Sequence, residues 1–198
     1  MSVELPHLQA VLRLMERFVH PWWLVGGWSL DLLAGEVTRD HHDIEVSIFR
    51  KNQFSLRSLL ADFETLTCLD ERWVPWRKGI AVGPPMFQVK ACRRVGVRVD
   101  PWLPNEFEFF LNDARDDRWF YRRDWRVSLP LSRLVVRSRT GVPCLRPEVV
   151  FLYKAKALRP QDEADFERHS RLLDTESRAW LKEALQLTFD GHPWIERL

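Results

Sequence analysis

The sequence lacks the features that mark secreted, disulfide-rich and membrane proteins. Its three cysteines are far apart, and they form neither a metal-binding Cys-x-x-Cys pair nor a disulfide framework. No stretch of about 18 apolar residues is present, so no helix is expected to span a membrane. The N-terminus has no basic segment followed by an apolar run, and no signal peptide is predicted. These absences favour a soluble cytoplasmic protein with reduced thiols.

An excess of one charge is also missing. Thirty Lys and Arg residues against 28 Asp and Glu residues leave a net charge of +2 over 198 residues. No strong overall field therefore favours nucleic acid or a membrane surface as a partner. Apolar residues, by contrast, make up 45% of the chain, which is sufficient for a buried core without disulfides or a structural metal.

The spacing of apolar residues predicts mixed strands and helices first, and helices alone towards the C-terminus. Strands are predicted at 22–25, 43–49 and 106–111, with two or three more between 65 and 92. Helices are predicted from residue 8 to Pro21, over 28–33 with closure at Gly35, and over 54–63. A β-hairpin or meander is expected at 118–145, and further helices start at Pro147, near Asp162 and near Thr175. This order predicts an α/β (α+β) fold, with a core over 1–112 followed by a β-hairpin and C-terminal helical lobe, 113–198, packed on it.

Two features of residues 23–46 bear on chemistry. Gly26-Gly27 lies between a predicted strand and a predicted helix, where free backbone N–H groups and the positive helix end can hold a phosphate. Asp43 and Glu45 are two residues apart on a predicted strand, so both carboxylates leave the same face. Paired oxygen ligands of this kind bind Mg²⁺, which can bridge phosphate oxygens. Each feature alone is usually a turn or a solvated face, but together they predict a magnesium–phosphate site.

The joint pattern resembles the nucleotidyltransferase superfamily, whose signature is Gly-Gly or Gly-Ser, a short helix, and two carboxylates flanking one apolar residue. The residues that resemble its small-molecule branch, which includes the aminoglycoside and lincosamide nucleotidyltransferases, are Gly26-Gly27-Trp28, Gly35, Thr38-Arg39, His41, Asp43 and Glu45. The resemblance continues in Pro147-Glu148, Tyr153-Lys154-Ala155-Lys156, Arg159 and residues 162–166. It implies a polymerase β-like core, a mixed sheet flanked by helices, followed by a helical lobe.

The same resemblance implies roles for individual residues. Asp43 and Glu45 would be catalytic metal ligands, although the commoner residue at the second position is Asp. The implied nucleotide-binding residues are Gly26, Gly27, Arg39, His41 and Lys154, with Arg39 and His41 orienting the carboxylates or closing the loop. Asp162 and Asp165 are interpreted more simply as helix-capping residues that complement the helix dipole.

A third carboxylate, acting as general base and metal ligand, is expected on a neighbouring strand. Glu108 is our choice because it interrupts the apolar run 107–111, where a buried charge requires a cation beside it. Glu106 shares its face and competes for the role. Asp100 is a further alternative, but Asp-Pro is a common start of a turn.

The sequence therefore predicts a Mg²⁺-dependent enzyme, with two ions, that transfers a nucleoside monophosphate, AMP from ATP, to a hydroxyl of a small molecule. An aminoglycoside or lincosamide antibiotic is the candidate acceptor, and a cationic acceptor would call for acidic residues such as Glu106, Asp113, Asp116 and Asp117. Two alternatives stay open. Eight arginines interleaved with aromatic residues in 113–140 could bind nucleic acid, and the chain could be a catalytically silent binding module of the same fold.

Overall fold

A computed structural model describes residues 4–198 of the chain, which form two compact units. The first unit contains the N-terminal stretch up to Trp23 together with Arg39–Asp113. The second contains Leu24–Thr38 together with Ala114–Leu198. None of the helices formed by residues 4–198 has the length and apolar character needed to cross a bilayer.

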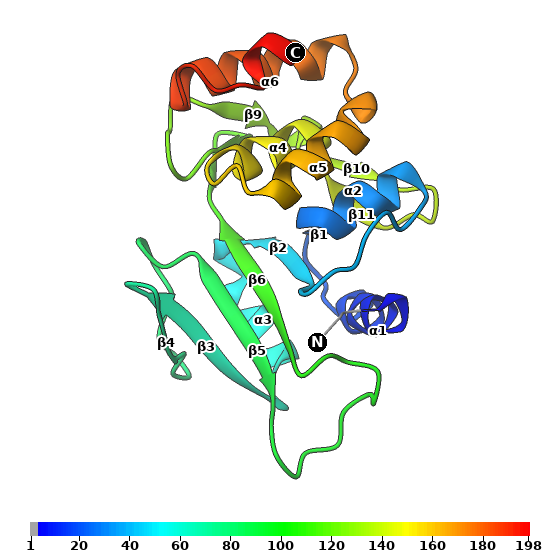
Figure 1. Cartoon of the computed structure of the whole chain (residues 1–198). Helices are drawn as coiled ribbons and strands as arrows, with labels where there is room; N and C mark the ends of the chain where they lie inside the picture. Colours follow the sequence, from blue (N-terminus) through cyan, green and yellow to red (C-terminus); the bar gives the residue numbers. More distant parts are fainter. Residues whose placement is uncertain (1–3) are drawn as a thin grey trace. The chain divides into compact units, whose positions relative to one another are not determined.

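The first unit is built on a mixed β-sheet (Figure 1). Its strands lie in the order β2 (Glu45–Phe49), β6 (Glu106–Asn112), β5 (Gln88–Arg93), β3 (Phe63–Leu69) and β4 (Arg72–Pro75). β2 and β6 are parallel, whereas the other neighbouring pairs are antiparallel. The sheet is accompanied by helix α1 (Leu5–Glu16), the 3-10 turn Arg50–Asn52 and helix α3 (Gln53–Leu59).

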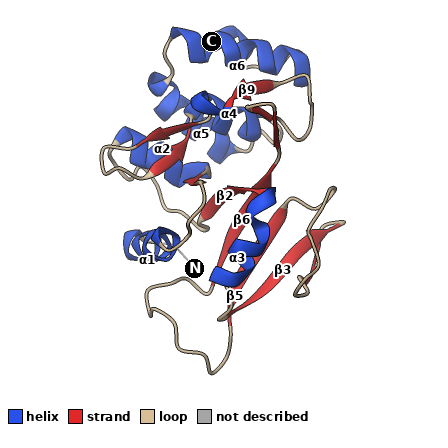
Figure 2. Ribbon diagram, turned by 180° about the vertical axis from the view of Figure 1, so that it is seen from behind, coloured by secondary structure: helices blue, strands red, loops and turns tan. Residues whose placement is uncertain are grey.

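The two faces of this sheet differ in polarity. One face is apolar and almost fully buried, with exposed fractions of 2% or less for Val46, Ile48, Val89, Ala91, Phe107, Phe109 and Leu111. Helix α3 lies against the sheet in both ribbon views and supplies the buried Leu56 (Figure 2). Alternation along the strands sends Glu45, Glu108 and Lys90 to the opposite face. Burial of one face thus fixes the register that presents these charged groups together.

The second unit combines short strands with helices. Leu24, the last residue of β1 (Trp22–Leu24), pairs in parallel with Cys144 of β11 (Pro143–Leu145), and β10 (Val135–Arg137) pairs antiparallel with β11. A separate antiparallel sheet contains β7 (Ala114–Arg115), β8 (Arg118–Phe120) and β9 (Ser128–Pro130). The helices are α2 (Gly26–Ala34), α4 (Pro147–Ala155), α5 (Pro160–His169) and α6 (Thr175–Thr188), with 3-10 turns at Leu131–Arg133, Ser170–Leu172 and Ile195–Arg197.

Aromatic side chains form the core of the helical part. The rings of Phe166 and Trp194 are stacked at a centroid distance of 4.2 Å, and Phe151 meets Phe166 edge-on at 5.1 Å. All three side chains are less than 2% exposed. Burial of such large apolar surfaces is the main favourable contribution to packing of α4 and α5 with the C-terminal segment.

The predicted fold class is confirmed: the structure is mixed α/β, with a mixed sheet flanked by helices and a C-terminal helical lobe. Several boundaries differ from prediction. Helix α1 ends at Glu16 rather than at Pro21, β2 begins at Glu45 rather than Asp43, and α3 ends at Leu59. The last difference has a clear cause, because Phe63 is needed in β3, where its ring packs edge-on against Phe107 at 5.4 Å.

Candidate active site

The first unit places acidic side chains on two adjacent strands. Glu45 at the start of β2 lies directly opposite Glu108 of β6, so the two side chains leave the same face of the sheet. The backbone N–H of Glu108 donates to the carbonyl oxygen of Ile44 at 3.0 Å, which ties the two strands together at this point. Asp43 precedes Glu45 by two residues, is exposed, and is separated from it by the buried Ile44.

Glu108 is a partly buried acid with a cation beside it. The Nζ of Lys90, its direct neighbour on β5, lies 3.4 Å from Oε1 of Glu108. Burial raises the pKa of Glu108, the Lys90 charge lowers it, and the negative charge of Asp43 raises it further, with a net increase. Asp43 is thus near enough to Glu108 for the two negative charges to interact. The cation expected beside Glu108 is thus present.

The two alternatives for the third carboxylate have different surroundings. Glu106 has a side chain that is 61% exposed and lies 3.2 Å from the Nζ of Lys90. Asp100 lies in a loop, where its oxygens accept hydrogen bonds from Arg13 at 2.8 Å and from the backbone N–H of Trp102 at 2.9 Å. These two hydrogen bonds lower the pKa of Asp100. The structure therefore places Glu108 next to Glu45 in the sheet, and Asp100 in a structural turn.

The donor set of this acidic group suits a hard cation. Within residues 4–198, no three or more His, Cys, Asp or Glu side chains are already arranged to hold a metal ion. Mg²⁺, however, is usually held by one or two carboxylates and substrate phosphates rather than by an all-protein cage. Asp43, Glu45 and Glu108 supply oxygen donors of the right type.

The residues just before β2 are held in different ways. The Nη1 of Arg39 donates to the carbonyl oxygen of Asp40 at 2.9 Å. His41 is 2% exposed, whereas His42 is exposed. Arg39 and His41 thus flank the approach to Asp43 in sequence, and the buried His41 helps to fix the chain there.

In the second unit, Gly26 and Gly27 begin helix α2. Gly26 has a φ of +69°, in the left-handed region that favours glycine, and Val25 before it is extended. The side chain of Val25, the N-cap residue, is apolar and cannot accept a hydrogen bond from the first turn. The helix ends where predicted, because Gly35 adopts a φ of +83° and its N–H donates to the carbonyl oxygen of Asp31 at 2.9 Å.

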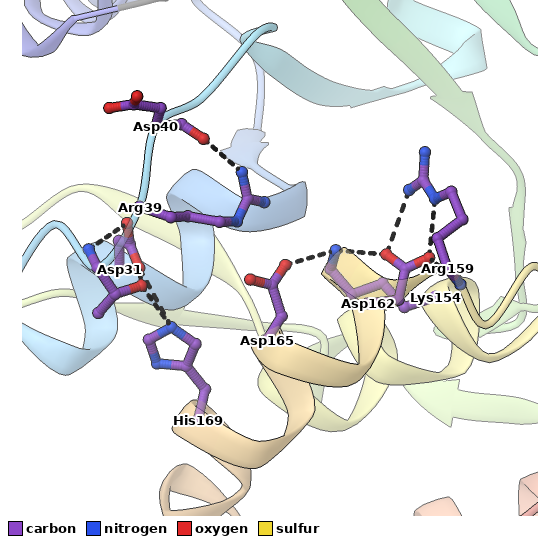
Figure 3. Close-up of polar contacts among 9 residues, drawn as sticks. Asp31, Arg39, Asp40, Lys154, Arg159, Asp162, Asp165 and His169 are labelled. Carbon is purple, nitrogen blue, oxygen red and sulfur yellow. Dashed lines mark hydrogen bonds and ion pairs between the residues drawn. The ribbon is translucent and has the colours of Figure 1, made fainter.

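Lys154 of α4 lies between two buried acids of α5 (Figure 3). Its Nζ is 2.9 Å from Asp162 Oδ1 and 2.7 Å from Asp165 Oδ2, and both carboxylate side chains are at most 2% exposed. Asp162 also accepts from the backbone N–H of Arg159, the capping contact that was predicted. Capping alone was an incomplete interpretation, because both acids also neutralise Lys154. Lys156, in contrast, is exposed.

A buried polar group in the second unit was missed by sequence reasoning. Asp31 of α2 accepts from the backbone N–H and the hydroxyl of Thr38, at 3.0 and 2.7 Å, and lies 3.2 Å from the Nε2 of His169 (Figure 3). Asp31 and His169 are 2% and 1% exposed. The available signal was an acid within the apolar run 28–33, since such a buried charge requires partners. These contacts connect α2, the loop after it and α5.

The arginine-rich stretch 113–140 makes many contacts within the second unit. Its arginines bind side-chain or carbonyl oxygens in the pairs Arg118–Ser128, Arg126–Asp124, Arg133–Glu176 and Arg137–Gly141. Arg122 and Arg123 lie over the ring of Tyr153, at 5.5 and 5.3 Å from its centroid. These contacts favour a structural role for the stretch over a nucleic-acid surface.

The mixed sheet, followed along the chain by a helical lobe, is a fold that solved structures share. The lincosamide antibiotic adenylyltransferase LnuA, bound to lincomycin, matches with a TM-score of 0.60 and 16% identity over 87% of this chain and 100% of that chain. ANT(2'')-Ia in complex with adenylyl-2''-tobramycin matches with a TM-score of 0.59 and 15% identity, over 91% of this chain and 95% of that chain.

The sequence identifies the family more directly. The profile of the aminoglycoside-2''-adenylyltransferase family matches residues 7–168, which is most of the chain. No curated protein matches the sequence. The chain belongs to the aminoglycoside-2''-adenylyltransferase family and is a nucleotidyltransferase.

Proposed function

We propose that the protein is a Mg²⁺-dependent adenylyltransferase of the cytoplasm that transfers AMP from ATP to a hydroxyl of an antibiotic, an aminoglycoside or a lincosamide. Family membership supports the adenylyl group and the class of acceptor. The observation that carries the chemical proposal is the position of Glu45 directly opposite Glu108, with Asp43 two residues before Glu45. Three acids gathered in this way are suited to a doubly charged cation and to proton transfer.

In this proposal Asp43 and Glu45 would hold two magnesium ions, and Glu108 would be a further ligand and the general base. Bound Mg²⁺ would offset the negative charge that develops at the α-phosphorus. Glu108 accepts the proton of the acceptor hydroxyl as the hydroxyl oxygen forms a bond to the α-phosphorus. The bond between the α-phosphorus and the oxygen that joins it to the β-phosphorus breaks, and pyrophosphate leaves. The raised pKa of Glu108 makes this carboxylate a stronger base than an ordinary surface glutamate.

Residues of the second unit are proposed to bind the nucleotide. Gly26 and Gly27 offer backbone N–H groups at the start of α2 to a phosphate. Lys154 offers an ammonium group whose position is fixed by Asp162 and Asp165. Arg39 and His41, before β2, are proposed to support nucleotide binding by fixing the chain that leads to Asp43.

The proposal is tested by measuring pyrophosphate release from ATP with Mg²⁺ and either tobramycin or lincomycin, and by detecting the adenylylated product by mass spectrometry. We expect Asp43→Asn and Glu45→Gln to reduce kcat by at least about 100-fold, because the metal ligands are lost. Chelation of Mg²⁺ should abolish product formation in the native protein.

Asp62→Asn is the matched control, because Asp62 is an exposed acid of the same unit and lies away from β2 and β6 in sequence. Its activity should equal that of the native protein. Full activity in Asp43→Asn, or product formation that persists without a divalent cation, would contradict the proposed metal site.

A further inference from the structure

Lys90 lies at the centre of a charged and aromatic cluster on the polar face of the first unit's sheet. Its Nζ is 3.2 Å from Glu106 Oε1, 3.4 Å from Glu108 Oε1 and 4.6 Å from the ring centroid of Trp73. The side chain is only 13% exposed, so its position is well defined. We name Trp73, Lys90, Glu106 and Glu108 the Lys90 cluster.

The contacts of this ammonium group are those with which proteins recognise a ligand amine. Carboxylates supply charge-assisted hydrogen bonds, and the face of a tryptophan attracts a cation. Here the chain's own Lys90 occupies these contacts. An amino group of an acceptor would have to compete with a covalently attached cation for the same oxygens and the same ring.

Of the other acids near Glu108, Asp43 and Glu45 are the proposed ligands of Mg²⁺ and are not left to bind an amine of the acceptor. Asp113, at the end of the strand that carries Glu108, forms two hydrogen bonds with Arg50, at 2.8 and 3.0 Å. Glu106 is shared with Lys90. An acceptor hydroxyl that approaches Glu108 therefore meets a fixed positive charge within 3.4 Å of the carboxylate that would take its proton.

We propose that Lys90 is a specificity-determining residue, which disfavours acceptors with an ammonium group next to the reacting hydroxyl and favours acceptors that carry less positive charge there. This inference rests on the proposed role of Glu108 and narrows the acceptor class of the same site. At a separation of about 10 Å near a protein surface, one unit charge changes binding by about tenfold. Lys90 thereby selects between antibiotics of different charge.

The test compares a polycationic acceptor, tobramycin, with lincomycin, which has a single basic amine. The measured quantity is the ratio of kcat/KM for tobramycin to kcat/KM for lincomycin. Lys90→Met keeps the length of the side chain but removes its charge, and it should raise this ratio by about tenfold. Lys90→Arg keeps the charge and should leave the ratio within about twofold of the native value. A general loss of Glu108 function would lower both kcat/KM values and cancel in the ratio.

Glu106→Gln provides a second variant that cannot fail through loss of a core contact, because Glu106 is largely exposed. It makes the cluster more positive, and it should lower the same ratio.

Calorimetric titration with each antibiotic in the absence of ATP gives the corresponding ratio of affinities, independent of catalysis. Absence of transfer in every variant would overturn the proposed function, while the affinity ratio would still decide the role of Lys90. An unchanged affinity ratio in Lys90→Met, or binding of neither antibiotic, overturns the inference.

Discussion

Cys144 is fully buried in β11, and burial raises the pKa of its thiol to about 11. At pH 8 roughly one such thiol in a thousand is ionised, and only the thiolate is an effective nucleophile. We expect Cys144 to stay unmodified when the native protein is treated with iodoacetamide at pH 8, whereas the half-exposed Cys68 is alkylated. Peptide mass spectrometry over time gives the two rates. Alkylation of Cys144 as fast as Cys68 in the folded protein would contradict this expectation.

Substitution of Glu108 tests its proposed role as general base. Glu108→Gln keeps the shape of the side chain but cannot accept the proton, so kcat should fall by about 100-fold to 10,000-fold. Glu106→Gln, on the same strand and face, should keep most of its kcat with lincomycin. Steady-state kinetics of these two variants and of Asp100→Asn give the kcat values to be compared. Loss of kcat in Asp100→Asn with retention in Glu108→Gln would move the role of base to Asp100.

Residue types could be predicted from the sequence more easily than their partners. The apolar run around Glu108 predicted that a cation must lie beside it, and that prediction is confirmed. Lys90 could not be identified as this cation, because its pairing depends on the register of β5 and β6. The residues between these strands form an irregular loop without a repeating pattern. The double contact of Lys154 with Asp162 and Asp165 was missed for a similar reason, since it requires two helices to pack together.

At the scale of elements, Gly26 and Gly35 give helix α2 two glycines of positive φ, one at each end. Alanine in this conformation costs about 1–2 kcal/mol. Gly26→Ala and Gly35→Ala should therefore lower the free energy of unfolding by similar amounts, as measured by chemical denaturation. Only Gly26→Ala should weaken ATP binding by calorimetry, because only Gly26 lies at the proposed phosphate-binding end. Equal losses of ATP affinity in both variants would contradict that assignment.

Helix boundaries that are marked by a strong local signal were predicted well. Gly35 ends α2, Pro147 begins α4, and Asp174 caps the start of α6, where its carboxylate accepts from the N–H of Ser177 at 2.7 Å. The region 118–145 was harder, because it divides between two different sheets. β8 and β9 pair with each other, whereas β10 pairs with β11. The sequence holds no local signal for this division, which is set by long-range strand pairing.

At the scale of the whole molecule, sequence order alone does not reveal how the chain groups into units. Leu24–Thr38 groups with Ala114–Leu198. This grouping depends on contacts between distant residues, such as the strand pair Leu24–Cys144 and the hydrogen bond from the Ser29 hydroxyl to the Leu145 carbonyl oxygen at 2.9 Å. Such contacts leave no periodic trace in the sequence. The grouping also gives the second unit an unusual set of buried acids: Asp31, Glu148, Asp162 and Asp165.

These buried acids make the stability of the second unit depend on pH. Burial alone would raise the pKa of Asp162, but hydrogen bonds from Arg159 and Lys154 outweigh it and hold the pKa below its ordinary value. A carboxylate with a lowered pKa in the folded state stabilises the protein above its unfolded pKa, near 4, and loses that contribution as the pH falls through the folded value. Acid should therefore weaken the contacts that join α4 to α5.

Asp162→Asn tests this dependence directly, because it leaves Lys154 with one carboxylate fewer. At pH 7 the free energy of unfolding of the variant should be about 3 kcal/mol lower than that of the native protein. The difference should shrink as the pH is lowered below about 4, where the native carboxylate also becomes protonated. Chemical denaturation followed by tryptophan fluorescence between pH 7 and pH 3 measures both curves, with the exposed Asp190→Asn as the control. If the gap between native protein and variant stayed constant over this range, the ionised contacts of Asp162 could not be the source of the stability.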